Sequence, residues 1–237
     1  MADGIATPRT VLFAGGGLVA REFVREDIPA WQAFYDANPE YFLAINGCVP
    51  PPDLAAIEFD ELPPPHLGFS RQWRIGLHEA LVARPGIAAA AGPTGPPGPP
   101  DPHEPRAPRA PREPCGPLAG AAMVTSDLCA PGVWHLGLFI VATRLHGSGA
   151  AQGAYEALEA WVRGQGARHL RLGVVRGNAP AERFWARQGY RELRVREGVD
   201  TGGRTNTVRV LLKPLDGEGI EAYLEAVPRD RADSPLP

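Results

Sequence analysis

The sequence predicts an α/β (α+β) fold in which helices flank a mixed, mostly antiparallel, twisted sheet. Three observations predict it. Several short segments alternate between apolar and polar residues, as half-buried strands do, and others carry apolar residues at helical spacing. Apolar residues make up 44% of the 237-residue chain, enough to build a core. Glycine and proline, with 28 and 27 residues, are about twice as frequent as usual, so part of the chain is expected to stay outside that core.

The elements can be assigned in order along the chain. Pro29 is suited to the first turn of a helix, and Trp31, Phe34 and Tyr35 follow at helical spacing. Later segments alternate between apolar and polar residues, as half-buried strands do, and the segment that contains Leu170 is an example. The expected helices are 28–38, 53–61, 149–164 and 180–188, and the expected strands are 70–80, 118–126, 133–141, 168–175, 190–196 and 205–213.

One domain over residues 18–227 is expected, interrupted by an insertion at 85–117 and followed by a flexible end at 228–237. The insertion holds 12 of the 27 prolines and almost no large aliphatic residue, which predicts disorder with polyproline II character. It is either a tolerated loop or a ligand for an SH3-like or WW-like domain. Residues 1–17 are expected to be a flexible terminus.

Composition excludes several classes of function. The net charge of −3 argues against nucleic-acid binding, which needs a basic surface. No apolar run is long enough to span a membrane. Cys48, Cys115 and Cys129 lack the spacing of a zinc site or a disulfide framework. We expect a cytoplasmic protein, monomeric or homodimeric, without a metal.

The chemistry is expected at residues 138–150, LFIVATRLHGSGA, where a strand, a turn and a helix follow one another. The turn reads Arg144-x-x-Gly147-x-Gly149. Backbone N–H groups at a helix N-terminus lack internal partners, and glycines let an anion approach closely, so the turn favours a phosphate. It is neither a P-loop nor a dinucleotide fingerprint, because Gln152 stands where the latter needs its third glycine.

Together with the block NAPAERFWARQGY at 178–190, this turn resembles the GNAT family of acetyl-CoA-dependent N-acetyltransferases, over about residues 118–213. The resemblance implies a splayed sheet with acetyl-CoA, a co-substrate, wedged in the splay. The strand would pair with the pantetheine arm and the turn would hold the pyrophosphate. The residues implied in binding are Leu138, Phe139, Ile140, Arg144, Leu145, His146, Gly147, Ser148, Gly149, Ala150, Asn178 and Trp185.

The proton chemistry departs from the family pattern. Trp185 stands where family members often carry a Tyr that protonates the leaving thiolate, and Tyr190 is either a substitute or a core residue. Presenting a lysine-like amine in its neutral form at pH 7 costs about 4.6 kcal/mol, more than the roughly 2 kcal/mol for releasing a thiolate. His135 is therefore the candidate catalytic base. The alternative is that His135 packs as a half-buried strand residue.

These observations predict transfer of acetyl from acetyl-CoA to a small-molecule or peptide amine, by direct attack in a ternary complex, with a backbone amide at 138–141 meeting the oxyanion. The acceptor cannot be read from the sequence. An aromatic cluster in the first helices either lines its pocket or belongs to the core: Trp31, Tyr35, Tyr41 and Phe42. Two other classes stay open, a non-catalytic acyl-CoA-binding module and an interaction protein acting through the Pro-rich segment.

Overall fold

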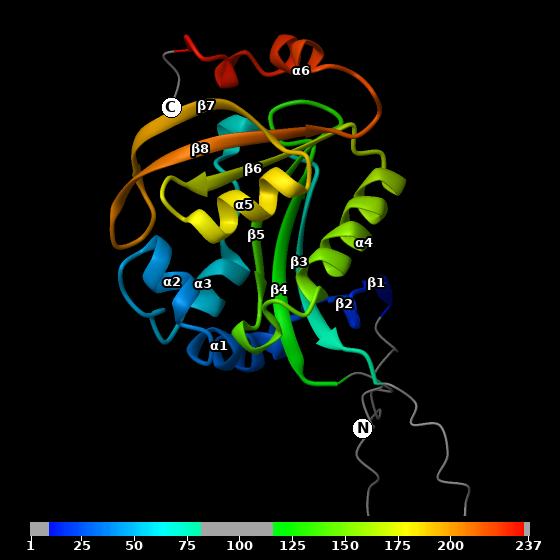
Figure 1. Cartoon of the computed structure of the whole chain (residues 1–237), viewed down its shortest axis with the longest axis vertical. Helices are drawn as coiled ribbons and strands as arrows, with labels where there is room; N and C mark the ends of the chain where they lie inside the picture. The colour runs from blue at the N-terminus through cyan, green and yellow to red at the C-terminus, as the bar shows by residue number, and fades with distance from the viewer. Residues whose placement is uncertain (1–9, 82–115, 235–237) are drawn as a thin grey trace, which may run out of the picture.

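The computed structural model describes residues 10–81 and 116–234. They form one eight-stranded sheet in the order β1-β2-β3-β4-β5-β6-β8-β7 (Figure 1). Neighbouring strands are antiparallel except β5 and β6, which are parallel, so the predicted fold class is confirmed. The strands are β1 (Val11–Gly15), β2 (Leu18–Glu22), β3 (Arg71–Glu79), β4 (Leu118–Ser126), β5 (Val133–Val141), β6 (His169–Val175), β7 (Arg191–Asp200) and β8 (Thr205–Pro214).

Helices cover both faces of the sheet. Helices α4 and α5 contribute to one large apolar cluster, and α1, α2 and α3 pack in a second cluster against β4 and β5. The α-helices are α1 (Ile28–Asp36), α2 (Glu40–Ile45), α3 (Leu54–Asp60), α4 (Ala150–Gly164), α5 (Ala179–Arg187) and α6 (Ile220–Ala226). Short 3₁₀ turns are η1 (Arg25–Asp27), η2 (Pro65–Leu67), η3 (Thr143–Leu145) and η4 (Pro228–Asp230).

The sheet opens between β5 and β6. The two strands pair only from Val133 with His169 to Leu136 with Leu172. Their C-terminal halves carry no such pairing, so the inner edge of β5 beyond Leu136 has free backbone groups. A cleft therefore lies inside the sheet, at the place where the parallel pair diverges.

A β-bulge at Gly137 changes which side chains of β5 share a face. Leu136 pairs with Val124 and Leu138 with Met123, so Gly137 has no partner on β4. One extra residue shifts the alternation that follows it.

Simple alternation along a regular strand would place His135, Gly137 and Phe139 on one face, and the bulge breaks this pattern. In the structure Phe139 joins the α4 cluster together with Leu136, whereas Leu138 lies in the cluster beneath α1.

Both termini are more ordered than expected. Strand β1 lies within the segment predicted to be flexible, and its hairpin with β2 packs on α4. A Cβ on Gly153 would lie 2.6 Å from Gly16 Cα, so the hairpin and the helix touch through backbone. At the other end, η4 places Asp230 in the core with 1% exposure. Buried contacts made by residues far apart in sequence order both segments.

The expected insertion at 85–117 lies outside the described residues apart from its last two. There the N–H of Gly116 donates to the carbonyl of Glu79 at 2.9 Å, so the end of β3 lies beside the residues that lead into β4. In the described part of the chain, no helix combines the length and apolar character needed to cross a bilayer.

Candidate active site

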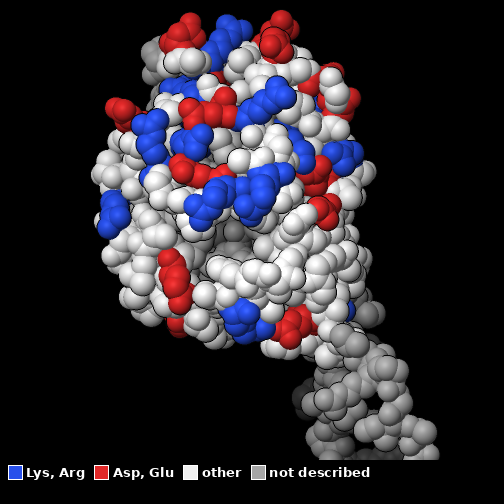
Figure 2. Space-filling model, viewed as in Figure 1, with Lys and Arg blue, Asp and Glu red and all other residues white. Residues whose placement is uncertain are grey.

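A cavity of about 840 Å³ occupies the opening between β5 and β6. Its walls come from both faces of the sheet, because α5 with the α4 turn lines one part and α2 with β7 and β8 lines another. Figure 2 shows a hollow on the face where α5 lies, bordered by Lys and Arg side chains. We name its two ends by their residues. The turn end comprises Thr143, His146, Gly147 and Ala151, and the His135 end comprises His135, Arg171, Arg196 and Thr201.

The turn end has the geometry of an anion site. Gly147 and Gly149 adopt positive φ, +79° and +86°, and a Cβ on either would meet open space. Gly153 is the first residue of α4 whose N–H reaches back one turn, to the carbonyl of Gly149 at 3.0 Å. The N–H groups of Ala151 and Gln152 precede it and lack intrahelical acceptors, so with the helix dipole they favour a negative guest.

The rest of the turn serves its own structure. Ser148 Oγ donates to the carbonyl of Leu145 at 2.7 Å and accepts from the N–H of Ala150 at 3.2 Å. His146 Nε2 donates to the carbonyl of Val141 at 3.0 Å. Arg144 forms an ion pair with Glu79 at 2.5 Å. The backbone, rather than the Arg144 guanidinium, is therefore what the turn offers to an anion.

The structure divides the residues expected to bind acetyl-CoA into two groups. Six of them line the cavity: Phe139, Ile140, His146, Gly147, Asn178 and Trp185. The other six do not line it: Leu138, Arg144, Leu145, Ser148, Gly149 and Ala150. Leu138 and Ala150 are buried in the core. The bulge turns Leu138 away from the cavity, and the β1–β2 hairpin packs against Ala150.

Asn178 and Trp185 form the wall that α5 contributes. Asn178 Oδ1 accepts from the N–H of Ala181 at 3.3 Å and so starts α5. The ring of Trp185 packs edge-on against Phe139, with 5.8 Å between centroids. Tyr190 is buried, and the hydroxyl of Tyr155 donates to its oxygen at 3.1 Å. Tyr190 is thus a core residue, and this part of the wall is apolar.

The aromatic cluster of the first helices is mostly core. Trp31, Tyr35 and Phe42 are buried, and Tyr41 alone of the four lines the cavity. Glu58 on α3 lies beside them and accepts a hydrogen bond from the Tyr35 hydroxyl. Burial raises the pKa of Glu58 to about 7.

His135 lines the cavity, but its environment does not suit a general base. Burial and the charge of Arg171 lower the pKa of His135 to about 3. Arg171 Nη1 lies 3.4 Å from His135 Nδ1, and a guanidinium can only donate, so Nδ1 accepts and the proton sits on Nε2. A Cβ on Gly137 would lie 3.8 Å from this Nε2. His135 therefore presents an N–H donor beside the bulge, at the start of the splay.

A buried ion pair holds Arg171 in place. Arg171 donates to Asp230 through Nε at 2.5 Å and Nη2 at 3.1 Å, and the Tyr223 hydroxyl donates to the same carboxylate. Burial alone would raise the pKa of Asp230, but the hydrogen bond from Arg171 lowers it. The tail after α6 thus reaches the active-site histidine through one arginine.

Arginines dominate the charge of the cavity. Arg171, Arg183, Arg187 and Arg196 line it, and Glu40 is the carboxylate among its described lining residues. Glu40 accepts from the Thr143 hydroxyl at 3.0 Å, at the turn end. Sequence reasoning missed these arginines because they come from three separate elements. The available signal was the alternation of charge in RELRVRE on β7, which places Arg194 and Arg196 on one face.

The β7–β8 hairpin and α2 meet over the cavity. Asn206 Nδ2 donates to the carbonyl of Ile45 at 2.7 Å and to the Thr201 hydroxyl at 2.8 Å. The contact with Ile45 joins residues 161 positions apart, so it encloses the His135 end from the side of α2.

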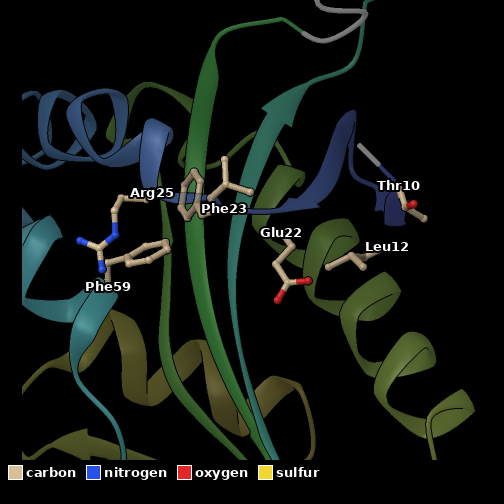
Figure 3. A pocket seen from close by; sticks show the side chains of 7 residues that line it. Thr10, Leu12, Glu22, Phe23, Arg25 and Phe59 are labelled. Atoms are coloured by element: carbon tan, nitrogen blue, oxygen red, sulfur yellow. The ribbon is translucent and has the colours of Figure 1, made fainter. Parts of the chain in front are cut away.

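A second, open hollow of about 470 Å³ lies between β2 and α3 and shares no lining residue with the cavity (Figure 3). Arg25 lies over the ring of Phe59 there, 5.1 Å from its centroid, and pairs with Asp60. The cation among its described lining residues is therefore already engaged, and the chemistry of the molecule lies in the larger cavity.

Comparison with known proteins places this geometry in a class. Residues 101–190 match the model of the acetyltransferase (GNAT) family, a stretch that includes β5, the Gly147 turn and the Asn178 block. A search of curated proteins found no match.

Solved structures agree on the fold. An acetyltransferase from Thermus thermophilus is 20% identical, with 84% of this chain and 97% of that chain covered and a TM-score of 0.52. A spermidine N-acetyltransferase from Vibrio cholerae, solved with CoA and spermine, is 13% identical, with 84% and 96% covered and a TM-score of 0.53. A GNAT-family acetyltransferase from Bacillus anthracis is 11% identical, with 86% and 98% covered and a TM-score of 0.55.

The family match and the solved structures thus agree on the acetyltransferase class. More specifically, residues 101–190 match the GNAT acetyltransferase domain that the sequence resembled, and the fold of the described residues agrees with that match.

Proposed function

We propose that the protein transfers the acetyl group of acetyl-CoA to the nitrogen of an amine acceptor within a ternary complex. The observation that carries this proposal is one cavity whose walls come from both faces of the sheet and whose middle is the divergence of β5 and β6. Two substrates entering from opposite faces would meet there without a covalent enzyme intermediate.

Acetyl-CoA enters from the face of α4 and α5. Its pyrophosphate accepts from the backbone N–H groups at the turn end, and its pantetheine arm pairs with the free edge of β5. Trp185 and Phe139 supply the apolar wall. Arg183 and Arg187 line the same part of the cavity from α5 and have no partner among the described residues, so they are free to meet further phosphate charge.

In the reaction, the amine nitrogen attacks the thioester carbon, and the carbonyl oxygen becomes an oxyanion. A backbone N–H on the open edge of β5 donates to this oxyanion. The C–S bond then breaks, the thiolate leaves as CoA, and the amine gives up its proton to solvent. His135 supplies an Nε2–H donor at this point and takes no proton itself.

The cationic surroundings reduce the need for a general base, because they favour the neutral form of the acceptor amine. Positive charges nearby disfavour a protonated amine and lower its pKa. An α-amino group, with a pKa near 7.8, costs only about 1 kcal/mol to present neutral at pH 7, against about 4.6 kcal/mol for a lysine-like amine. The cavity therefore favours weakly basic acceptors.

The test is release of CoA from acetyl-CoA with a panel of amines, measured across pH in the wild type and in His135→Gln. We expect turnover in the wild type. The pH profile of kcat/KM should show no ionisation near pH 6.5 that is lost in His135→Gln. The CoA affinity should be the same in both proteins. An ionisation near 6.5 that disappears in His135→Gln would restore the histidine as the base. Binding of CoA without turnover of any amine would favour a non-catalytic acyl-CoA-binding module.

A further inference from the structure

We propose that the acceptor carries an anionic group, a carboxylate or a phosphate, and that Arg196 is the residue that binds it. This inference rests on the proposed function and names the substrate class of the same site. It makes Arg196 a specificity-determining residue and leaves the chemical step to the groups already described.

The first step of the argument is that Arg196 is unengaged. Its side chain is half-buried and lines the cavity. Within the described part of the chain, no hydrogen bond or ion pair holds its guanidinium. The neighbouring Arg171, in contrast, is bound through two of its nitrogens by Asp230. A half-buried cation without a partner has lost part of its hydration, so such a site favours a ligand that supplies the missing charge.

The second step is the electrostatics around Arg196. Burial, and then the charges of Arg171, Arg229 and Arg194, lower the pKa of Arg196, and Asp230 offsets this only in part. Asp230 is already engaged by Arg171 and Tyr223. Arg196 therefore lies in a positive field to which neighbouring guanidinium groups contribute, and an anion bound beside Arg196 would be stabilised by that field.

The third step is location. Arg196 shares the His135 end with Arg171, His135 and Thr201, whereas the phosphate-binding backbone lies at the turn end. Thr143 is eight residues along β5 and η3 from His135, and strand residues rise about 3.3 Å each. The charge at Arg196 is therefore separate from the site proposed for the pyrophosphate and lies where the acceptor would enter.

The fourth step is what the charge excludes. A polyamine would bring several positive charges to a cavity already lined by four arginines, and repulsion between like charges would weaken its binding. An amino acid or a phosphorylated amine brings one anion for Arg196 and one amine for the thioester. The structure thus favours acceptors whose amine and anion lie on one molecule.

The experiment measures CoA release by the full chain with matched acceptors that differ only in charge. The probes are L-amino acids against their amides, O-phosphoethanolamine against ethanolamine, and spermidine. We expect an acid to exceed its neutral partner in kcat/KM, and spermidine to be poor. The carboxylate and phosphate pairs separate the two sources of the anion. Equal rates for acids and amides, or a preference for spermidine, would overturn the proposal.

Arg196→Gln supplies the second arm, with Arg191→Gln as the matched control at an exposed position of the same strand. Loss of a charged hydrogen bond predicts a roughly 10- to 100-fold fall in kcat/KM for the anionic acceptor, carried by KM, with little change for its neutral partner. The CoA dissociation constant should not change. A fall of the same size in Arg191→Gln, or none in Arg196→Gln, would contradict the assignment.

A binding measurement separates this inference from the proposed function. N-acetyl amino acids and inorganic phosphate are titrated into the CoA-saturated protein, and the shift in Tm is recorded for wild type and Arg196→Gln. Stabilisation that the variant loses supports the anion site even when no amine is acetylated, an outcome that would reject only the transferase. If neither turnover nor Arg196-dependent stabilisation is observed, the anion site is rejected.

Discussion

The two ends of the cavity are built in different ways. At the turn end, one continuous stretch from β5 to α4 supplies the glycines, the helix start and the free N–H groups. At the His135 end, β5, β6 and β7 each contribute a charged or imidazole side chain, and Asp230 of η4, 59 residues from Arg171, holds that arginine in place. A local motif defines the first end, and only the tertiary fold defines the second.

This difference separates their chemistry. Backbone N–H groups at a helix start bind phosphate whatever the neighbouring side chains are, so the turn end suits a substrate shared by a whole enzyme class. Side chains gathered from distant segments can change independently, so the His135 end suits the substrate that differs between enzymes. Substitutions at one end should therefore leave the other intact.

The largest effect is expected from Gly147→Glu. The new side chain must occupy a left-handed backbone position and places a carboxylate where the phosphate would bind, and like charges brought together cost several kcal/mol. CoA affinity, measured by calorimetry, should fall at least about 100-fold. Gly166→Glu is the matched control, because Gly166 has φ of +96° at the other end of α4. Equal CoA affinity in Gly147→Glu and wild type would remove the turn from the binding site.

The next effect is on the His135 end. Asp230→Asn leaves Arg171 buried without its counter-charge, which predicts a loss of about 3 kcal/mol in the free energy of unfolding. CoA affinity of the folded variant should be unchanged, because the turn end does not depend on this pair. Urea unfolding and calorimetry check both expectations, with the exposed Asp233→Asn as control. A variant that keeps its stability but loses CoA would invert the assignment of the two ends.

A pH-dependent effect on stability is expected from Glu58, which lies on α3. Its folded pKa of about 7 lies above the ordinary value near 4.3, so the folded state holds a proton that the unfolded chain releases. Stability contributed by this group is complete below about pH 4.3 and is lost as the pH rises through about 7. The loss is at most about 4 kcal/mol. In Glu58→Gln this dependence should vanish, as urea unfolding at several pH values between about 4 and 8 would reveal; the same pH dependence in both proteins would contradict it.

The smallest effect is expected from removing residues 86–114, which belong to neither end. The backbone groups of Glu79 and Gly116 already meet, so a short turn can join β3 to β4. The free energy of unfolding should change by less than about 1 kcal/mol, with CoA affinity unchanged. A larger loss of stability would mean that the segment packs on the domain, and a lost cellular effect with intact catalysis would support a partner for the Pro-rich sequence.

Sequence reasoning succeeded where the signal was local. Strands β4 and β5 begin and end at the predicted residues, because alternation and the flanking glycines are written within each segment. It failed at β1, a five-residue strand whose order depends on contact between Gly16 and α4. The bulge at Gly137 had a readable signal, a glycine inside a strand pattern, which often marks such a site.

The histidine illustrates the limit for the site. Its position on β5 could be predicted, but its proton chemistry depends on Arg171, which depends in turn on Asp230 in a tail expected to be flexible. No spacing rule connects these three residues. That Arg196 has no partner among residues 10–81 and 116–234 could not be read from the sequence either, because it is a property of the folded chain.

A crystal structure of the complex with CoA tests the central claim most directly. The account predicts the pyrophosphate on the N–H groups of Ala151 and Gln152 beside Gly147, the pantetheine along β5, and the sulfur beside Gly137 and His135. Acceptor space would then remain at Arg196. A cofactor bound in the hollow between β2 and α3, or with its sulfur directed away from His135, would contradict the account.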